Sequence, residues 1–359
     1  MMKRWHAAKR LLPLFAGLVL LLSACGREDL SAINPQGPVA EKQYGLMTLS
    51  ISIMTLVVVV VFAISFYVII RYRRKPGQND IPKQVEGNHK LEIIWTVIPI
   101  VLLLILAVPT AKYVFAFAED YSKDENAIKV NVTSHQYWWE FEYPEYGIRT
   151  AQDLIIPTNK KIAINLRTQD VLHSFWVPSL AGKMDTNTEG NLNKMYIEAT
   201  KENVYRGKCA ELCGPSHAYM DFKVKAVNED TFKAWVNEMN AEPKAWTGDP
   251  AAYDKFKTSC LSCHALDNSQ SLGPNLKGLG SRESIAGIML NRDNVSEPIN
   301  QDLMEQHLRE WIVDPERVKP GNAMTNGMTG VEFTDEELDQ IVDYLSNYKL
   351  DSLKEINKQ

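Results

Sequence analysis

A short segment, CAELCGPSHAYM from Cys209 to Met220, gathers two cysteines, a histidine and a methionine. One cysteine, one histidine and one methionine, with a second histidine from elsewhere, are the ligands of a blue-copper site. Because Cys213 follows Cys209 by four residues, both thiolates of a curved loop can point to one side and bridge two copper ions. We expect the missing histidine to be His173, at the start of the segment HSFWVP. The alternative is a Cys209–Cys213 disulfide, which is geometrically awkward at this spacing.

A second motif, C-x-x-C-H, occupies Cys260, Cys263 and His264. Two thiols at this spacing can form thioether bonds to haem while the adjacent histidine binds iron. The segment GPNLKGLG follows, and VKPGNAM supplies a methionine before a final helix, both as a haem-binding segment requires. A redox-active C-x-x-C disulfide is the alternative, but it gives the histidine and the methionine no purpose.

Two apolar runs lie upstream of these motifs, from Gly45 to Ile70 and from Ile93 to Ala111. Neither contains a charge and each is about long enough to cross a bilayer, so we predict membrane helices at about 45–70 and 93–117. Arg71 and its basic neighbours start the connecting loop, which the positive-inside rule places in the cytoplasm, with both flanks outside. A hairpin buried in a soluble core is the alternative.

The N-terminus has a basic head, an apolar run and small residues before Cys25, which is the anatomy of a secretory signal over residues 1–24. The ending LSAC resembles the bacterial lipobox, which implies a lipid such as palmitate on Cys25. The alternative is a cysteine that follows an uncleaved leader. The segment 25–118 then holds the N-terminus of the mature chain and the helical hairpin.

The remaining chain reads as two domains outside the membrane. Short β-branched and aromatic segments between 128 and 227 predict an antiparallel sandwich or barrel, and a helix over 229–240 completes a domain at 119–240. A linker at 241–249, which contains Pro243 and is followed directly by Pro250, leads to a mostly helical domain at 250–359, where Thr334 and Glu337 predict a capping box. Acidic residues outnumber basic ones in this tail, which disfavours nucleic acid as a partner.

The copper motif resembles that of subunit II of haem-copper cytochrome c oxidases, as do LEIIWTVIP, SHQYWWEFEY, HSFWVP and GKMDTN. The resemblance spans residues 40–227 and implies a cupredoxin-like β-sandwich with a binuclear copper A centre bridged by Cys209 and Cys213. It further implies that His173 and Met220 complete one copper. His217 and the carbonyl of Glu211 complete the other, and the Glu211 side chain reaches a magnesium or manganese ion at the border with the catalytic subunit.

The same resemblance raises three further residues. Glu92 matches a position at the mouth of a proton pathway, although it could equally be an interfacial anchor. Tyr137 stands where many relatives have a tryptophan that accepts electrons from soluble cytochrome c, so Tyr137 and Trp139 are candidate electron-transfer aromatics. His135 matches no ligand position and is interpreted as a structural strand histidine.

Residues 250–349 resemble a class I cytochrome c domain, which is all-α. The resemblance implies covalent haem on Cys260 and Cys263, with His264 as one iron ligand. Met324 is the expected sixth ligand and Met328 its rival, because Met324 is followed by threonine rather than by the commoner proline. A short tether to the copper domain would give this haem an effective concentration of about millimolar there.

Together these resemblances imply the electron-input subunit of a caa(3)-type cytochrome c oxidase, anchored in a bacterial cell membrane. The implied partners are the haem-copper subunit I, other membrane subunits, the lipid bilayer, and a cytochrome or quinol–cytochrome reductase as electron donor. Alternatives are the electron-input subunit of a nitric oxide reductase, a relation to nitrous oxide reductase, and a membrane-anchored copper and haem carrier. A quinol oxidase subunit with a purely structural sandwich is opposed by the intact ligand set.

Overall fold

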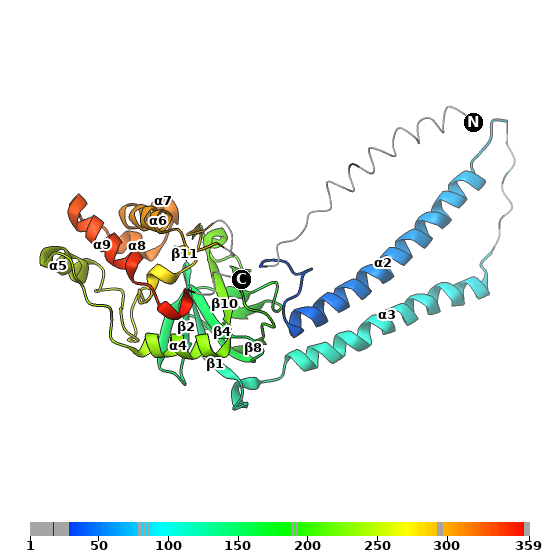
Figure 1. Cartoon of the computed structure of the whole chain (residues 1–359). Helices are drawn as coiled ribbons and strands as arrows, with labels where there is room; N and C mark the ends of the chain where they lie inside the picture. The colour runs from blue at the N-terminus through cyan, green and yellow to red at the C-terminus, as the bar shows by residue number, and fades with distance from the viewer. Residues whose placement is uncertain are drawn as a thin grey trace.

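The structure, a computed structural model, contains a helical hairpin, a β-sandwich and a small helical domain in chain order (Figure 1). It describes residue 17 and residues 29–354, except for 78–80, 82–83, 85, 189, 191 and 293–296. The predicted signal segment, apart from Gly17, and the lipid candidate Cys25 lie outside the described residues.

Two long helices, α2 (Pro38–Arg71) and α3 (His89–Phe117), lie side by side and extend away from the rest of the chain (Figure 1). Both are long and apolar enough to cross a membrane, and their central side chains are exposed in the chain on its own. Helix α2 begins earlier than the predicted residue 45, because Pro38 at its first turn and Glu41 beside its N-terminus suit a helix start. Asn88 caps α3 through the backbone N–H groups of Lys90 and Leu91.

Two five-stranded sheets form the sandwich, in the orders β3-β2-β1-β5-β8 and β4-β10-β9-β6-β7. Most pairs are antiparallel as predicted, but β1 pairs with β5 and β4 with β10 in parallel. The strands are β1 (Ile128–His135), β2 (Trp138–Tyr143), β3 (Ile148–Ala151), β4 (Asp153–Pro157), β5 (Ile162–Thr168), β6 (His173–Trp176), β7 (Met184–Thr186), β8 (Asn193–Ile197), β9 (Asn203–Cys209) and β10 (Asp221–Val227).

Alternating side chains fill the space between the sheets, as the period of a strand requires. Trp139, Phe175 and Phe222 meet there, with ring centroids 4.6–5.7 Å apart in each pair. Helix α4 (Glu229–Asn240) closes one end of the sandwich, where Trp235 packs edge-on against Tyr143 at 5.1 Å.

The C-terminal domain has its own core, built mainly by α5 (Pro250–Ser259), α6 (Gln301–Val313) and α9 (Asp335–Asn347). The predicted capping box is confirmed, since the Thr334 side chain accepts from the Glu337 N–H and the Glu337 carboxylate accepts from the Thr334 N–H. The domain is not entirely helical, because a hairpin of β11 (Ser284–Ile285) and β12 (Met289–Leu290) interrupts it. Two short helices complete it: α7 (Pro315–Val318) and α8 (Ala323–Gly327).

The helical domain packs directly on the sandwich, over strand β10 (Figure 1). Every residue of β10 is buried: Phe222 and its inward neighbours face the sandwich core, while Lys223 and Lys225 face the helical domain. Lys225 lies 3.1 Å from Asp153 of the sandwich and 2.9 Å from Glu283 of the helical domain. The linker 241–249 also packs on the domain, since the Lys244 N–H binds the Tyr348 hydroxyl at 3.1 Å. The two domains are therefore docked against each other, whereas the short tether expected from sequence required only a flexible connection between them.

Candidate functional site

The four candidate copper ligands of the segment 209–220 lie at the end of β9 and on the loop that leads to β10. Cys209 is the last residue of β9, Met220 immediately precedes β10, and the turn His217–Tyr219 lies between them. Strand β6 pairs with β9 so that Phe175 lies opposite Cys209, and this register brings His173 to the same end of the sheet. Neighbouring strands thus supply the one ligand candidate that the loop lacks.

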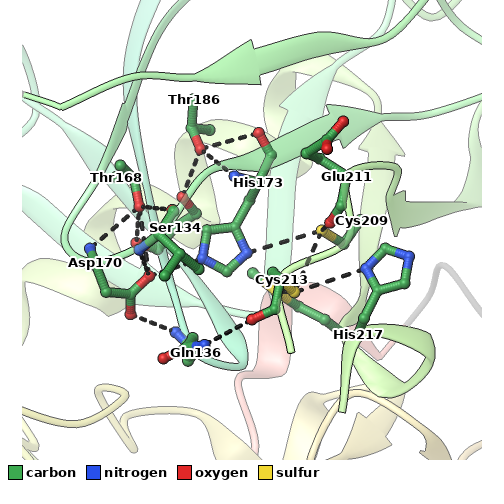
Figure 2. Close-up of polar contacts among 12 residues, drawn as sticks. Ser134, Gln136, Thr168, Asp170, His173, Thr186, Cys209, Glu211, Cys213 and His217 are labelled. Atoms are coloured by element: carbon green, nitrogen blue, oxygen red, sulfur yellow. Dashed lines mark hydrogen bonds and ion pairs between the residues drawn. The ribbon is translucent and has the colours of Figure 1, made fainter. Parts of the chain in front are cut away.

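Both thiols are buried and lie between two imidazole rings, as Figure 2 shows. The Sγ atoms of Cys209 and Cys213 are 3.9 Å apart, which is too far for a disulfide. His173 Nδ1 lies 3.8 Å from Cys209 Sγ, and His217 Nδ1 lies 3.6 Å from Cys213 Sγ. The thioether of Met220 is 3.9 Å from Cys213 Sγ, and the carbonyl of Glu211 is 3.3 Å from Cys209 Sγ. This donor set fits two bridged copper ions.

The surroundings favour a thiolate at one of the two cysteines. Contact with the Cys213 thiol and with His173 lowers the pKa of Cys209, although burial opposes this. The same contact with Cys209, together with burial, raises the pKa of Cys213. Without a metal the pair therefore holds one proton readily, and a bound cation is what would let both sulfurs ionise.

Asp170 and Gln136 orient the site, and the sequence reasoning did not identify either of them. Asp170 Oδ1 lies 2.8 Å from His173 Nε2, so the imidazole presents Nδ1 to the thiols (Figure 2). The Gln136 backbone N–H binds Asp170 Oδ2 at 2.7 Å, and its side-chain amide donates to the Cys213 carbonyl at 2.6 Å. The position of Asp170, three residues before a candidate ligand histidine, was the sequence signal that could have identified it as the partner of that ring.

The other residues implied by the oxidase resemblance differ in how far their side chains are exposed to solvent. Trp139 is fully buried and donates its indole N–H to the Met220 carbonyl at 3.4 Å. Tyr137 is only 3% exposed, beneath the helical domain. Glu211 is exposed, and Figure 2 shows its carboxylate turned away from the thiols. His135 stacks on Trp138 with centroids 4.1 Å apart, in keeping with a structural role.

Glu92 lies in the first turn of α3. Figure 1 shows that this helix starts at the end of the hairpin that is farthest from the β-sandwich. The Glu92 carboxylate is 3.7 Å from His89 Nδ1 and about half exposed. A carboxylate near a helix N-terminus is electrostatically favourable, which is also what an interfacial anchor would show.

The C-x-x-C-H motif follows α5 rather than lying within it, because the helix ends at Ser259 and Cys260 is its C-cap. A further turn is held by the His264 N–H donating to the Cys260 carbonyl at 2.9 Å. His264 Nδ1 lies 2.7 Å from the Pro274 carbonyl, so that nitrogen carries the proton and Nε2 is left for iron. Burial lowers the pKa of His264, which also favours the neutral ring that a metal needs.

A cavity of about 810 Å³ adjoins this motif, and its lining includes Cys263, His264, Leu266, Trp246 and Tyr344. Its size, and a lining that is partly apolar and partly polar, fit a large planar group. Met324 lies in α8 and Met328 caps it, and both are partly buried against the core of the helical domain. Neither methionine lines this cavity, so the residues that fit a covalent haem here are Cys263 and His264 of the C-x-x-C-H motif.

Comparisons with known proteins agree with these two centres. Three family models match: "Cytochrome C oxidase subunit II, transmembrane domain" at residues 32–112, "Cytochrome C oxidase subunit II, periplasmic domain" at 147–227, and "Cytochrome c" at 252–349. Together they cover the hairpin, most of the sandwich and the helical domain.

Several curated relatives match over most of the chain. Cytochrome c oxidase subunit 2 of Bacillus sp. (strain PS3) is 49% identical and covers 95% of this chain and 98% of its own length. The subunit of the same name from Bacillus subtilis (strain 168) is 44% identical, covering 98% of this chain and all of its own length. A quinol oxidase subunit 2 from Bacillus anthracis is 36% identical but covers only 68% of this chain and 84% of its own length. The chain therefore belongs to the cytochrome c oxidase subunit II family, in the form that carries two membrane helices and a C-terminal cytochrome c domain.

Proposed function

We propose that this chain is the electron-input subunit of a membrane-bound cytochrome c oxidase of caa(3) type. Electrons pass from a covalent haem c to a binuclear copper A centre and on to a haem-copper catalytic subunit, which reduces oxygen to water and pumps protons. The observation that carries this proposal is the convergence of two thiols, two imidazoles and a thioether at one buried point, in a chain whose cytochrome c domain is docked on the same sandwich.

The roles of the copper residues follow from what each atom can donate. Cys209 and Cys213 would hold the two ions through their thiolates, and His173 and His217 through the Nδ1 atoms that face the thiols. Met220 and the Glu211 carbonyl would supply the remaining, weaker donors. Bound copper supplies one-electron redox chemistry, and the buried cage around it limits how far the ligands can move between oxidation states.

On the cytochrome side, Cys260 and Cys263 would form the thioether bonds, and His264 would hold iron through Nε2. Met324 is the proposed sixth ligand. Replacing Met324 with alanine should abolish the spectrum of a methionine-ligated haem, and replacing Met328 with alanine should leave it intact. The reverse pattern would assign the ligand to Met328.

Several finer assignments rest on the chain's sequence and on the resemblance. The carboxylate of Glu211, an exposed residue of the copper loop, is proposed to reach a magnesium or manganese ion shared with the catalytic subunit. Cys25 carries the lipid anchor, and both soluble domains lie on the outer face of the membrane. A cytochrome or quinol–cytochrome reductase supplies the electrons. The proposed limits are 25–118 for the N-terminal segment and hairpin, 119–240 for the copper domain and 250–359 for the cytochrome domain. The linker 241–249 joins the last two.

Glu92 is proposed to take up protons at the cytoplasmic end of α3. Replacing Glu92 with glutamine keeps its size but removes its charge, so oxidase turnover should fall while haem and copper contents stay constant. Unchanged turnover would assign Glu92 to anchoring at the membrane surface.

The first test is the metal content and the electron paramagnetic resonance spectrum of the full chain in detergent. We expect two coppers and one haem per chain, with one unpaired electron shared equally by two copper nuclei. One copper with a blue-type signal, or a Cys209–Cys213 disulfide with none, would overturn the copper A assignment. Copurification with a large haem-bearing subunit separates an oxidase subunit from a free-standing electron carrier.

A further inference from the structure

The surface of the sandwich beside the copper loop is covered by one segment of the cytochrome domain. The Ser216 hydroxyl, fully buried, donates to the Pro320 carbonyl at 2.6 Å. Lys319 is 3% exposed, and its ammonium donates to the Tyr137 carbonyl at 2.8 Å. A Cβ at Gly321 would lie 3.7 Å from the Tyr137 hydroxyl, so the backbone there lies against the aromatic ring. Residues 319–321, called here the covering segment, thus seal Tyr137 and Ser216 from solvent.

The covering segment is ordered by contacts within its own domain. Both carboxylate oxygens of Glu316 accept from the Gly321 N–H at 3.0 Å. The Asn322 amide donates to the carbonyls of Pro315 and Lys319 at 2.9 and 2.7 Å, and Asn322 also caps α8, the helix that carries Met324. A proposed haem ligand is therefore tied, within a few residues, to the surface next to the copper loop.

The side-chain nitrogens of two buried lysines also hold the β11–β12 hairpin against the sandwich. Lys319 donates to the Ala286 carbonyl at 2.6 Å, and Lys223, from the sandwich, donates to the Gly287 carbonyl at 3.1 Å. A Cβ at Gly287 would lie 2.5 Å from the Asp221 carbonyl oxygen, and Gly287 has φ +83°, so only glycine fits this contact without strain. Lys319 is the one of these groups that joins the hairpin to Tyr137.

We propose that the Tyr137–Ser216 surface is the permanent seat of the chain's own cytochrome domain, and that Lys319 is a positioning residue that keeps it closed to external donors. A soluble electron donor then cannot reach copper across this face and has to reduce the haem first. One electron leaves the external donor, passes to the haem iron and then to copper, with no bond made or broken. This inference rests on the proposed function and adds which surface of the copper domain receives the chain's own cytochrome domain.

The test compares four forms of the complete, metal-loaded oxidase: the unaltered chain, Lys319→Met, Gly287→Ala and the control Lys257→Met. Lys257 is an exposed lysine of the same domain. Hydrogen exchange is measured in peptides that contain Tyr137 and Ser216. Because Lys319→Met leaves two buried carbonyls without a donor, we expect exchange there to rise about tenfold or more. Gly287→Ala should do the same by a steric route, and Lys257→Met should change nothing.

The second readout is the order in which the centres are reduced when reduced soluble cytochrome c is added. In the unaltered chain and in Lys257→Met we expect haem always to precede copper. In the two opened variants, a fraction of copper should be reduced directly, and transfer from haem to copper should slow. Equal exchange in all four forms, or direct reduction of copper in the unaltered chain, would overturn the proposal. Absence of haem, of copper or of any transfer between them in the unaltered chain would instead refute the proposed function.

Discussion

Replacing Lys225 with methionine tests what holds the two soluble domains together. The Lys225 ammonium is buried and contacts three acceptors: Asp153 at 3.1 Å, Glu283 at 2.9 Å and the Ser281 carbonyl at 2.6 Å. Removing one partner from a buried ion pair costs about 3–5 kcal/mol, because the remaining charge stays buried without compensation. Glu283 keeps Arg292 at 2.6 Å, so we take the lower end, about 3 kcal/mol. This corresponds to an increase of about 100-fold in the population of undocked domains.

The assay is hydrogen exchange in the full chain, followed in peptides from β10 and from residues 281–287. Lys233→Met is the matched control, since Lys233 also pairs with a carboxylate at 2.9 Å but with both side chains more than half exposed. We expect this control to leave protection unchanged, because solvent screens an exposed ion pair. Adding Asp153→Asn to Lys225→Met should restore part of the loss, because it removes one uncompensated charge. If Lys225→Met behaves like Lys233→Met, buried charge pairing does not hold this interface.

Three further predictions follow from single contacts. Asp170→Asn should weaken copper binding by about 10- to 100-fold, because it loosens the orientation of the His173 ring. Copper titration against a competing chelator measures the affinity, and an unchanged affinity would refute the role of Asp170. Gly273→Ala should displace His264, since the added Cβ would lie 2.8 Å from its ring; an unaltered haem spectrum would show that the ring has room to move. Burial opposes ionisation of Glu283, yet Lys225 and Arg292 hold the pKa of this carboxyl below the ordinary 4.5. The contribution of Glu283 to domain docking should therefore be complete above pH 4.5 and be lost as the pH falls below 4.5. Hydrogen exchange at the interface, compared between the unaltered chain and Glu283→Gln from about pH 7 downward, tests this, and identical pH profiles would contradict it.

The copper and haem motifs could be identified from sequence because their ligands are close together in the chain. Cys209, Cys213, His217 and Met220 occupy one loop, so loop geometry alone brings them together. The same holds for the capping box at Thr334, and for the membrane helices, whose charge-free length is itself the signal. His173 was expected from its place at the start of the segment HSFWVP, and the register of β6 against β9 explains why it lies beside the loop.

Strand β10 shows the limit of this reasoning. Its sequence DFKVKAV alternates polar and apolar residues, which is the pattern of a strand with one solvated face. The structure buries both faces, because Glu283 and the carbonyls of Ser281 and Gly287 satisfy the lysines in place of water. These partners lie more than 50 residues away along the chain, and no local pattern encodes such a pairing.

The sequence by itself therefore determined the two redox centres and the membrane hairpin, since each depends on residues that are neighbours in the chain. Only the tertiary structure decided how the centres are supported and joined. It showed Asp170 and Gln136 behind the copper ligands, the parallel strand pairs in the sandwich, and the cytochrome domain seated over Tyr137. These features come from contacts between distant segments, whose geometry is fixed by packing and by the need to satisfy buried polar groups.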